Sequence, residues 1–457
     1  MKDIKETVIN YIESHFEEIP ALASRLISHN SVKAPAEKDM PFGKGAAAAL
    51  AEFDGMCRDF GFTTKNFDNY ALHADMDGKE PMLGILCHLD VVPEGTGWHS
   101  DPFKPEIRDG RLYGRGAIDD KGPAVAALFA MHCVKELGIP LKGGVRMIVG
   151  CDEENGSSDM EYYQKKEKFP DMLVTPDGDY PVINIEKGML RFELKCSIDG
   201  IVTSLHGGKA INAVPEYCEA AVTGVTPSEI MSYANGIEGI DFEARNGSGT
   251  TIITAKGVCA HASTPELGHN AVTAMLCVLG KIPACPAQIK ALSELFPYGE
   301  TNGQSLGIAC SDERSGSLTA LLSVLDIENG RLCGKIDSRF PVTSTLADIS
   351  GKLSGTLSDK GFESTLTLGD EPHYVDPDSD FIKTLLSVYT DITGKDGHPL
   401  AIGGGTYVHN TKNGVAFGAE FPGEDNHMHG ADESISLESL KLNAEIYAMA
   451  IIRLLAE

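Results

Sequence analysis

An apolar run of strand length that ends in polar residues is the sequence feature that most constrains this chain. The run begins at Met82, reaches His88, and is followed by Asp90 before the chain leaves through Pro93. A buried strand that presents an imidazole and a carboxylate at its end is a natural start for a metal site. The carboxylate fixes the tautomer of the imidazole and raises its basicity. A lone histidine at a strand end more often forms only a hydrogen bond, so a metal site needs support from other residues.

Composition narrows the class of protein. The chain has 457 residues, enough for two or three domains with a core in each. Lys and Arg total 39 and Asp and Glu total 66, so the formal net charge is −27. This acidity argues against a nucleic acid or an anionic membrane as partner, because both attract basic surfaces.

Three further features predict a cytoplasmic protein. The sequence has no run of about 18 apolar residues, so it predicts no transmembrane helix. The charged N-terminal segment lacks the apolar centre of a signal peptide. The 11 cysteines are scattered without paired spacing, which indicates reduced thiols.

The first part of the chain alternates predicted helices and strands. Up to about Ala71 we expect helices only. A short hairpin is expected around Asp109-Gly110. Strands alternating with helices predict an α/β layer with a parallel or mixed sheet, in which ligands bind just beyond the strand ends. The expected helices are 3–17, 20–28, 44–60, 124–137 and 160–166, and the expected strands are 82–89, 145–151 and 172–175.

After Gly188 the pattern changes to strands of antiparallel type with helices between them, and near residue 378 the first pattern returns. The sequence therefore predicts an α/β domain, 1–187 and 376–457, interrupted by an inserted α+β domain, 188–375. The expected strands of the insert are 191–197, 220–225, 250–257, 318–328, 331–339 and 363–368, and its helices are 227–235, 269–280, 287–296 and 346–359. The last part should contain a helix at 378–392, a strand near 414–418 and a helix at 436–455.

Candidate metal ligands lie where strands or loops end. Zinc and similar ions bind His nitrogen and carboxylate oxygen, and two-metal hydrolases need a bridging carboxylate. Adjacent carboxylates at a strand end point in different directions, so one can bind metal while the other faces the substrate water. The alternative is a pair of solvated acids. The candidates are His88, Asp119, Glu153, Glu154, Asp177 and His429.

Five motifs in one order resemble a known family. They are CHLDVVPEG, GRGAIDDKGP, DEENGSSD, TPDGDYP and HMHGADE. Their order and wording resemble the co-catalytic zinc metallopeptidase family of aminoacylases, carboxypeptidase G and bacterial dipeptidases. The GAIDDKGP wording, the large insert and a GGGTY segment at 403–407 are most similar to the peptidase V-type dipeptidases. The resemblance covers nearly the whole chain and implies a mixed-sheet catalytic domain interrupted by a lid domain.

The resemblance implies roles for residues of the α/β domain. Asp90 would orient His88, Glu153 would act as general base, and the Asp119–Asp120 peptide would be cis. Asp119 would bridge two divalent ions, one completed by Glu154 and His429 and the other by His88 and Asp177. We prefer His429 to His427 as ligand because the family's ligand stands four residues before a Glu, here Glu433. Zinc is the expected metal, with manganese or cobalt as alternatives.

The resemblance also implies substrate contacts. His261 in the insert would stabilise the oxyanion, and Asn212 would touch substrate. Arg339 would bind the substrate's C-terminal carboxylate with two hydrogen bonds. Gly404 and Thr406 would bring backbone N–H groups against a carboxylate. The alternatives are a capping histidine, a salt-bridged arginine and a flexible turn.

The function implied is hydrolysis of small peptides, namely dipeptides with a free C-terminus, by a functional unit that is a monomer. An N-acyl-amino-acid deacylase with the same metal centre is one alternative. A non-catalytic metal- or peptide-binding homologue is another, although Glu153 argues against it because a binder needs no base. Val408-His409 departs from the branch, which carries a small residue and Arg after GGGTY, and this leaves the substrate contacts open.

Overall fold

The computed structural model describes residues 2–457, which form two compact units. Unit 1 contains the residues up to Asn184, Val375–Leu400 and Gly405–Glu457. Unit 2 contains Ile185–Tyr374 and the short segment Ala401–Gly404. The second unit thus begins three residues before the predicted insert and also includes a segment from the part of the chain that follows it.

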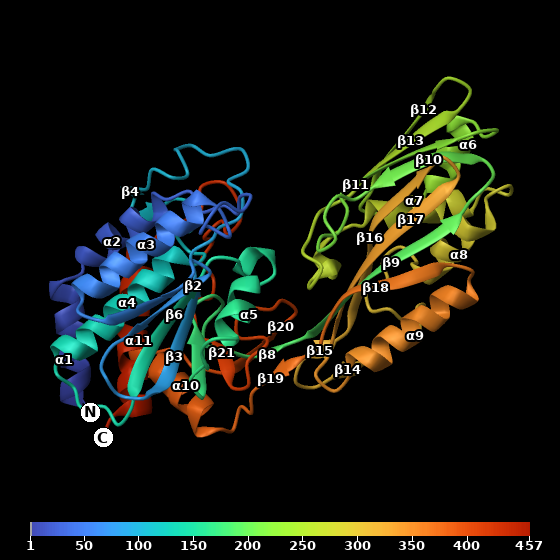
Figure 1. Ribbon diagram of the computed structural model, residues 1–457. Helices are drawn as coiled ribbons and strands as arrows, with labels where there is room; N and C mark the ends of the chain where they lie inside the picture. Colours follow the sequence, from blue (N-terminus) through green and yellow to red (C-terminus); the bar gives the residue numbers. More distant parts are fainter. Residues whose placement is uncertain (1) are drawn as a thin grey trace. The chain divides into compact units, whose positions relative to one another are not determined.

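A mixed sheet forms the centre of unit 1 (Figure 1). Its strand order is β1-β2-β6-β3-β7-β21-β8-β19, with β20 paired to β8. β3 is parallel to β6 and β7, and β21 is parallel to β7, whereas β1, β2 and β6 are antiparallel neighbours. This confirms the predicted mixed-sheet α/β fold. The strands that lie wholly in unit 1 are β1 (Thr63–Phe67), β2 (Ala71–Asp75), β3 (Pro81–His88), β6 (Gly144–Gly150), β7 (Met172–Thr175) and β21 (Gly414–Ala416). β8 (Val182–Glu186) and β20 (Pro399–Ile402) begin in unit 1 and end among residues assigned to unit 2, and β19 (His373–Tyr374) consists of residues assigned to unit 2.

A small second sheet in unit 1 has the order β22-β5-β4. It consists of β4 (Glu106–Arg108), β5 (Arg111–Tyr113) and β22 (Ser434–Ser436). The turn between β4 and β5 is formed by Asp109 and Gly110, both with positive φ, so the predicted hairpin is confirmed. Pairing of β5 with β22 connects segments that are more than 300 residues apart in the sequence.

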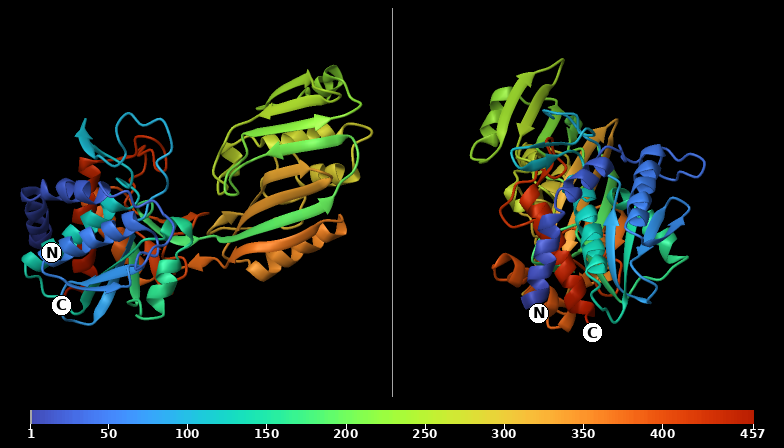
Figure 2. Two further views of the ribbon diagram at one scale, coloured as in Figure 1. Left: turned by 45° about the horizontal axis from the view of Figure 1, so that its top comes forward. Right: turned by 90° about the vertical axis from the view of Figure 1, so that its left-hand side faces the viewer.

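Helices cover the sheet of unit 1. They are α1 (Lys2–Ser14), α2 (Glu18–Ile27), α3 (Lys44–Asp59), α4 (Lys121–Glu136), α5 (Ser158–Gln164), α10 (Asp380–Thr393) and α11 (Leu437–Leu455), with a 3-10 turn η1 (Glu153–Asn155). α1 packs against α4 and α11, so the first and last helices lie side by side (Figure 2). Among residues 2–457, no helix combines the length and the apolar character that a membrane span requires.

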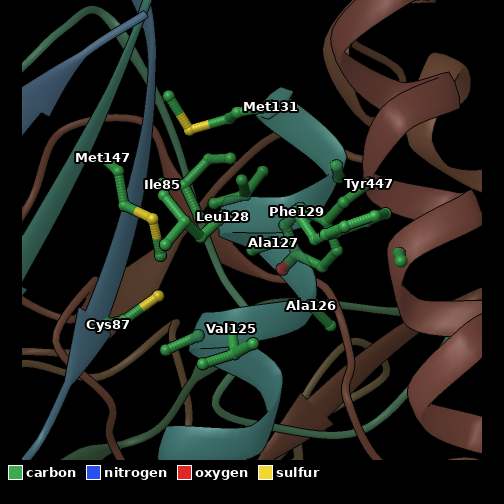
Figure 3. Close-up of a cluster of buried hydrophobic side chains, with 14 of the residues drawn as sticks. Ile85, Cys87, Val125, Ala126, Ala127, Leu128, Phe129, Met131, Met147 and Tyr447 are labelled. Atoms are coloured by element: carbon green, nitrogen blue, oxygen red, sulfur yellow. The ribbon is translucent and has the colours of Figure 1, made fainter. Parts of the chain in front are cut away.

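The central strands are buried on both faces. Alternate residues of β3 point to opposite sides of the sheet, so Ile85 and Cys87 join the main core while Leu86 joins a smaller cluster on the other face. Figure 3 shows Ile85 and Cys87 beside the apolar side chains of α4, among them Leu128. Burial on both faces explains why β3 is an almost continuous apolar run in the sequence.

Unit 2 is built on an antiparallel sheet of order β12-β13-β11-β10-β16-β17-β9-β18. One core joins the sheet to its four helices, which pack on one face. The strands are β9 (Gly188–Ser197), β10 (Val202–Gly207), β11 (Tyr217–Val222), β12 (Asp241–Asn246), β13 (Thr251–Lys256), β16 (Thr319–Glu328), β17 (Arg331–Phe340) and β18 (Glu363–Asp370). The other elements are α6 (Pro227–Ala234), α7 (Ala271–Gly280), α8 (Ala287–Leu295), α9 (Leu346–Asp359), the turn η2 (Pro265–Leu267) and a two-stranded ribbon of β14 (Ser311–Asp312) and β15 (Gly316–Ser317).

Two polar strands at sheet edges, β1 and β12, were not predicted from the sequence. The expectation of helices alone up to Ala71 was wrong, because β1 lies at the edge of the unit 1 sheet. β12, at the edge of the unit 2 sheet, was not predicted either. An edge strand needs few inward apolar residues, and in β1 only Phe67 is buried. Such strands therefore lack the apolar alternation that marks a strand in sequence.

A buried histidine gives unit 1 a pH-dependent stability. His73 on β2 is 4% exposed, and its Nδ1 lies 3.0 Å from the hydroxyl of Tyr163. Burial, followed by the charge of Arg146, lowers the pKa of His73 to about 4. In an unfolded chain the pKa of histidine is about 6.5. Between pH 6.5 and 4 the unfolded state therefore binds more protons, and the free energy of unfolding decreases as the pH falls.

We predict that His73→Gln removes this part of the pH dependence. The difference in unfolding free energy between the wild type and the variant should shrink as the pH is lowered from 7 to 4, as measured by denaturant unfolding at several pH values. His398→Gln, at an exposed position of unit 1, is the control and should leave the profile unchanged. A constant difference between the wild type and His73→Gln would contradict the prediction.

Candidate metal centre

Parallel strands of unit 1 bring the candidate ligands to one edge of the sheet. His88 ends β3, Glu153 and Glu154 lie in η1 after β6, and Asp177 follows β7. Because β3, β6 and β7 are parallel neighbours, their carboxyl ends lie at the same edge, where ligands bind in open α/β sheets. Asp119, before α4, and His429, before β22, complete the set.

The six side chains form two groups of potential metal donors. The first group contains His88, Glu153 and Asp177, and the second contains Asp119, Glu154 and His429. Within each group, one donor atom from each residue lies within 4.8 Å of the others. The alternative ligand His427 is in neither group, and its Nε2 lies 3.8 Å from the carboxylate of Asp425. The geometry therefore favours His429.

Asp119 belongs to the second group and also contacts the first. Its Oδ1 is 2.8 Å from Nε2 of His88, and its Oδ2 is 2.7 Å from Nε2 of His429. The two oxygens of one carboxylate thus contact imidazoles of different groups, which is the arrangement that a bridging ligand needs. The Asp119–Asp120 peptide is cis, as the resemblance implies.

Mutual repulsion of the carboxylates changes their proton affinity. Burial and then the charge of Asp119 raise the pKa of Asp177 to about 7. Burial and the charge of Asp177 raise the pKa of Glu153 well above its ordinary value. Contacts with Asp119 and Glu154 raise the pKa of His429 to about 11. The raised pKa values of the two acids and of the histidine all mean that the cluster favours added positive charge.

The two residues at the centre of the cluster shift in opposite directions. Burial lowers the pKa of His88, but contacts with the carboxylates of Asp119 and Asp90 outweigh burial and leave it well above its ordinary value. Burial would raise the pKa of Asp119, but the close contacts with the imidazoles of His429 and His88 outweigh it and hold that pKa far below its usual range. Asp119 therefore stays ionised, as a bridging ligand must.

The donor set fits divalent metal ions. Within residues 2–457, Nε2 of His88 and Oε1 of Glu154 are buried polar atoms with no aligned hydrogen-bond partner. Nε2 of His88 approaches Asp119 closely without that alignment, and Oε1 of Glu154 lies 3.3 Å from Nε2 of His429. Unaligned donor atoms that converge in this way suit coordination of a common ion better than hydrogen bonding.

Asp90 contacts His88 and also a second part of the centre, which the sequence did not reveal. Nδ1 of His88 is 3.0 Å from the carbonyl oxygen of Asp90 and 3.5 Å from its carboxylate, so the carbonyl is the nearer acceptor. The two carboxylate oxygens accept the backbone N–H groups of Glu153 (3.1 Å) and Glu154 (3.2 Å). Asp90 thus connects the His88 strand end to the turn that carries both glutamates.

Unit 2 holds four of the predicted substrate residues close to one another. The segments of Asn212 and His261 are adjacent through a bridge between Ala213 and His261. His261 is exposed, and its Nδ1 lies 2.7 Å from the hydroxyl of Ser263. A side chain at Gly403, next to Gly404, would collide with Ser263.

Arg339 is mostly buried, 4% exposed, in unit 2. Its Nε and Nη2 donate to the carboxylate of Asp337, and its Nη1 donates to the carbonyl of Gly403 at 2.8 Å. These contacts place it beside the glycine-rich segment. A contact with substrate stays a prediction, as do the substrate roles of Asn212, His261 and Gly404.

Thr406 lies in unit 1, next to a contact that the sequence did not reveal. The hydroxyl of Tyr407 donates to the buried carboxylate of Asp159. The same carboxylate oxygen accepts the N–H groups of Cys151 (2.6 Å) and Asp152 (2.8 Å), directly before Glu153. Asp159 and Tyr407 both lie inside motifs, but no spacing links the two. Val408 is buried in the same small core, so one of the two departures after GGGTY serves packing.

Sequence reasoning also missed the roles of Arg115 and Glu433. In the sequence, Glu433 was used only to identify His429 as the ligand that stands four residues before a glutamate. In the structure it is 0% exposed and pairs with Arg115, which is 1% exposed. Burial, with the charge of Asp119, raises the pKa of Glu433 to about 7, although Arg115 opposes the shift. The only hint in the sequence was that a basic residue and an acidic residue each stand inside one of the five motifs.

Comparison with known proteins places the chain in a family. The model of Peptidase family M20/M25/M40 matches residues 84–453, a range that contains all five motifs. The chain belongs to this family. Membership confirms the resemblance drawn from the motifs, and the metal dependence of M20 peptidases agrees with the two donor groups.

Relatives within the M20/M25/M40 family match over almost the whole chain. YtjP of Bacillus subtilis (strain 168) is 38% identical over 429 residues, which cover 91% of this chain and 92% of YtjP. Beta-Ala-Xaa dipeptidase of Lactobacillus delbrueckii subsp. lactis is 33% identical over 473 residues, which cover 99% and 98% of the two chains. Human carnosine dipeptidase 1 shares the fold, with a TM-score of 0.63, 14% identity and 98% of each chain covered.

The contacts of Asp90 generate a prediction for this M20 peptidase. Asp90→Ala removes the acceptor of two backbone N–H groups and loosens the turn that carries Glu153 and Glu154. We expect the affinity for divalent metal to fall about 10- to 100-fold, the range for residues that hold metal ligands in place. Zinc titration of the metal-depleted protein measures the change. Asp101→Ala, at a loop residue that contacts Lys104, is the control. Equal metal affinity in Asp90→Ala and the wild type would contradict the assignment.

Proposed function

We propose that the protein is a metal-dependent dipeptidase that hydrolyses the peptide bond of dipeptides with a free C-terminal carboxylate. The observation that carries the proposal is the position of Asp119 between two three-residue donor groups, one of which contains Glu153. The family supports peptide hydrolysis. A relative that is 33% identical over nearly the full chain is named Beta-Ala-Xaa dipeptidase, and this supports dipeptides as the substrate class.

We further propose two zinc ions per chain, with His88, Asp119 and Asp177 as ligands of one and Asp119, Glu154 and His429 as ligands of the other. Manganese and cobalt suit the same nitrogen and oxygen ligands. When bound, the two ions would polarise the scissile carbonyl and lower the pKa of the attacking water. The raised pKa of Asp177 and the close contacts of Asp119 support this ligand set.

Glu153 is the residue that we assign as general base. Burial and the charge of Asp177 raise the pKa of Glu153, and a raised pKa strengthens a carboxylate as a proton acceptor. In the proposed mechanism Glu153 takes the proton of the attacking water and then gives it to the leaving amine. Asp90 holds the backbone of Glu153 through the 3.1 Å hydrogen bond, so the carboxylate keeps its orientation.

Residues of the inserted unit are proposed to bind the substrate. His261 would donate to the oxyanion, a contact that is typically worth about 3–4 kcal/mol, and Asn212 would contact the peptide. Arg339 would bind the C-terminal carboxylate through Nη1, which now donates to the carbonyl of Gly403. Gly404 and Thr406 would offer backbone N–H groups. We propose that the inserted unit acts as a lid and that one chain suffices for activity.

A cytoplasmic location is also proposed. The support is chemical, because all 11 cysteines are free in the described chain, and most of them are buried or partly buried. Free thiols are the normal state of cysteine in a reducing compartment.

The role of Glu153 is testable with a variant of the same shape. Glu153→Gln removes the basic carboxylate, so we expect kcat for dipeptide hydrolysis to fall about 10²- to 10⁴-fold. Metal content, measured by atomic emission, should stay close to two ions per chain. Glu161→Gln, an exposed glutamate on α5, is the matched control and should keep full activity. Full turnover by Glu153→Gln would exclude the residue as the base.

A substrate panel tests the proposed specificity. Dipeptides, including β-alanyl dipeptides, should be hydrolysed faster than N-acetyl amino acids. Amidation of the dipeptide C-terminus should raise KM, because it removes the carboxylate that Arg339 is proposed to bind. Measurement of kcat/KM for each class separates the possibilities. A preference for N-acetyl amino acids would indicate a deacylase. An absence of metal-dependent turnover on every dipeptide would favour the binding homologue.

A further inference from the structure

A buried ion pair lies directly behind the second donor group of the metal centre. Arg115 and Glu433 are 1% and 0% exposed and contact each other through Nη1 and Oε2. Neither side chain belongs to a donor group. Burying an arginine and a glutamate is costly, and removing only one partner of such a pair is strongly destabilising. We therefore expect the two buried side chains to have a specific structural role.

Glu433 holds the loop that carries Asp119. Its Oε1 accepts the backbone N–H groups of Gly116 (3.0 Å), Ile118 (3.1 Å) and Asp119 (3.3 Å). Three convergent N–H groups on one carboxylate oxygen fix the path of the backbone over residues 116–119. The position of the bridging carboxylate thus depends on a residue four positions after His429.

Arg115 holds the loop that carries His429. Its Nη2 lies 3.2 Å from the carbonyl oxygen of His429 and 3.1 Å from that of Gly430. The same nitrogen lies 3.4 and 3.3 Å from the carbonyls of Pro93 and Glu94, on the loop after β3. One NH₂ group has two hydrogens, so these four acceptors share them, and the guanidinium charge attracts all four carbonyl dipoles.

The His429 loop needs such support because its backbone is unfavourable. His427, His429 and Asp432 all have positive φ, at 50°, 59° and 57°. Residues other than glycine adopt this region at a cost, and they keep it only where the surroundings impose it. Arg115, through the carbonyls of His429 and Gly430, and Glu433, at the end of the same loop, supply that constraint.

We propose that Arg115 and Glu433 form a positioning clamp that sets the separation of Asp119 and His429 and thereby the affinity of the second donor group for its ion. The proposal rests on the two-metal centre proposed above. His88, Glu153 and Asp177 have other supports: His88 lies in the β3 ladder, and Glu153 is held by Asp90. Asp119 belongs to both proposed ligand sets, whereas His429 belongs only to the second, so the clamp acts on the second group more than on the first.

The test measures the two metal affinities separately. Metal-depleted wild type, Glu433→Gln and Arg115→Lys are titrated with Zn²⁺ against a competing chelator, and two dissociation constants are fitted. His429→Ala identifies which constant belongs to the second group. Arg115→Lys keeps the buried positive charge but loses the planar arrangement of N–H donors. It therefore provides a second test of the clamp if Glu433→Gln fails to fold.

We expect both clamp variants to weaken the second site about 10- to 100-fold, the usual effect of a lost residue behind a ligand, and to weaken the first site by a clearly smaller factor, because Asp119 is its only ligand that the clamp holds. In His429→Ala, adding Glu433→Gln should weaken the remaining site by a smaller factor than Glu433→Gln alone weakens the second site. The matched control is Asp75→Asn, which removes the charge of Asp75 and one of the two oxygens that accept from Arg146 elsewhere in unit 1, and it should change neither constant.

Two outcomes would overturn the clamp. One is an equal loss at both sites. The other is unchanged metal affinity in Glu433→Gln and Arg115→Lys with thermal stability lowered as in Asp75→Asn, which would assign the pair to stability alone. The readout is independent of turnover. A wild type that binds two ions but cleaves no dipeptide would reject the proposed function and still test the clamp, whereas a wild type that binds one ion would reject the two-metal centre on which the clamp rests.

Discussion

Electrostatic repulsion at one edge of the unit 1 sheet is the constraint on which the rest of the unit depends. Asp119, Glu153, Glu154 and Asp177 converge there, in a chain whose net charge is −27. Buried carboxylates this close raise one another's pKa values unless a cation balances them. Burial and, after it, the charge of Asp119 raise the pKa of Asp177 to about 7. A bound divalent ion is often the largest charge in such a site and reverses this effect.

A second set of carboxylates supports the first. Asp90 accepts the N–H groups of Glu153 and Glu154, Asp159 accepts those of Cys151 and Asp152, and Glu433 accepts three N–H groups around Asp119. These acids act on the backbone rather than on substrate or metal. Carboxylates therefore have two different roles around this centre. Those of Asp90, Asp159 and Glu433 fix the geometry of the loops, whereas those of the two donor groups present oxygen atoms for coordination. Preorganised loops of this kind lose little entropy when a ligand binds.

Local features of the chain were predictable from sequence, and long-range ones were not. The β3 run and its terminal His88 form a continuous signal, and the candidate ligands lie within short motifs whose order is informative. The polar strand β1 gave no such signal, because only Phe67 faces inward. Asp90 was recognised, yet its contact with the Glu153 turn depends on two strand ends that only the folded sheet brings together. Arg115 and Glu433 are separated by 318 positions, and no periodicity connects residues at that distance.

The interruption of unit 1 by the inserted unit has a consequence for biosynthesis. β21 pairs with β7, but Gly414 is made 239 residues after Thr175. At about 5–20 residues per second, the ribosome needs roughly 12–48 s to cover that distance. Throughout this interval His88, Asp119 and both glutamates have been synthesised, while His429 and Glu433 have not. During this interval the nascent chain therefore carries the acidic ligands without the last imidazole, and the complete set of metal ligands exists only after His429 has been synthesised.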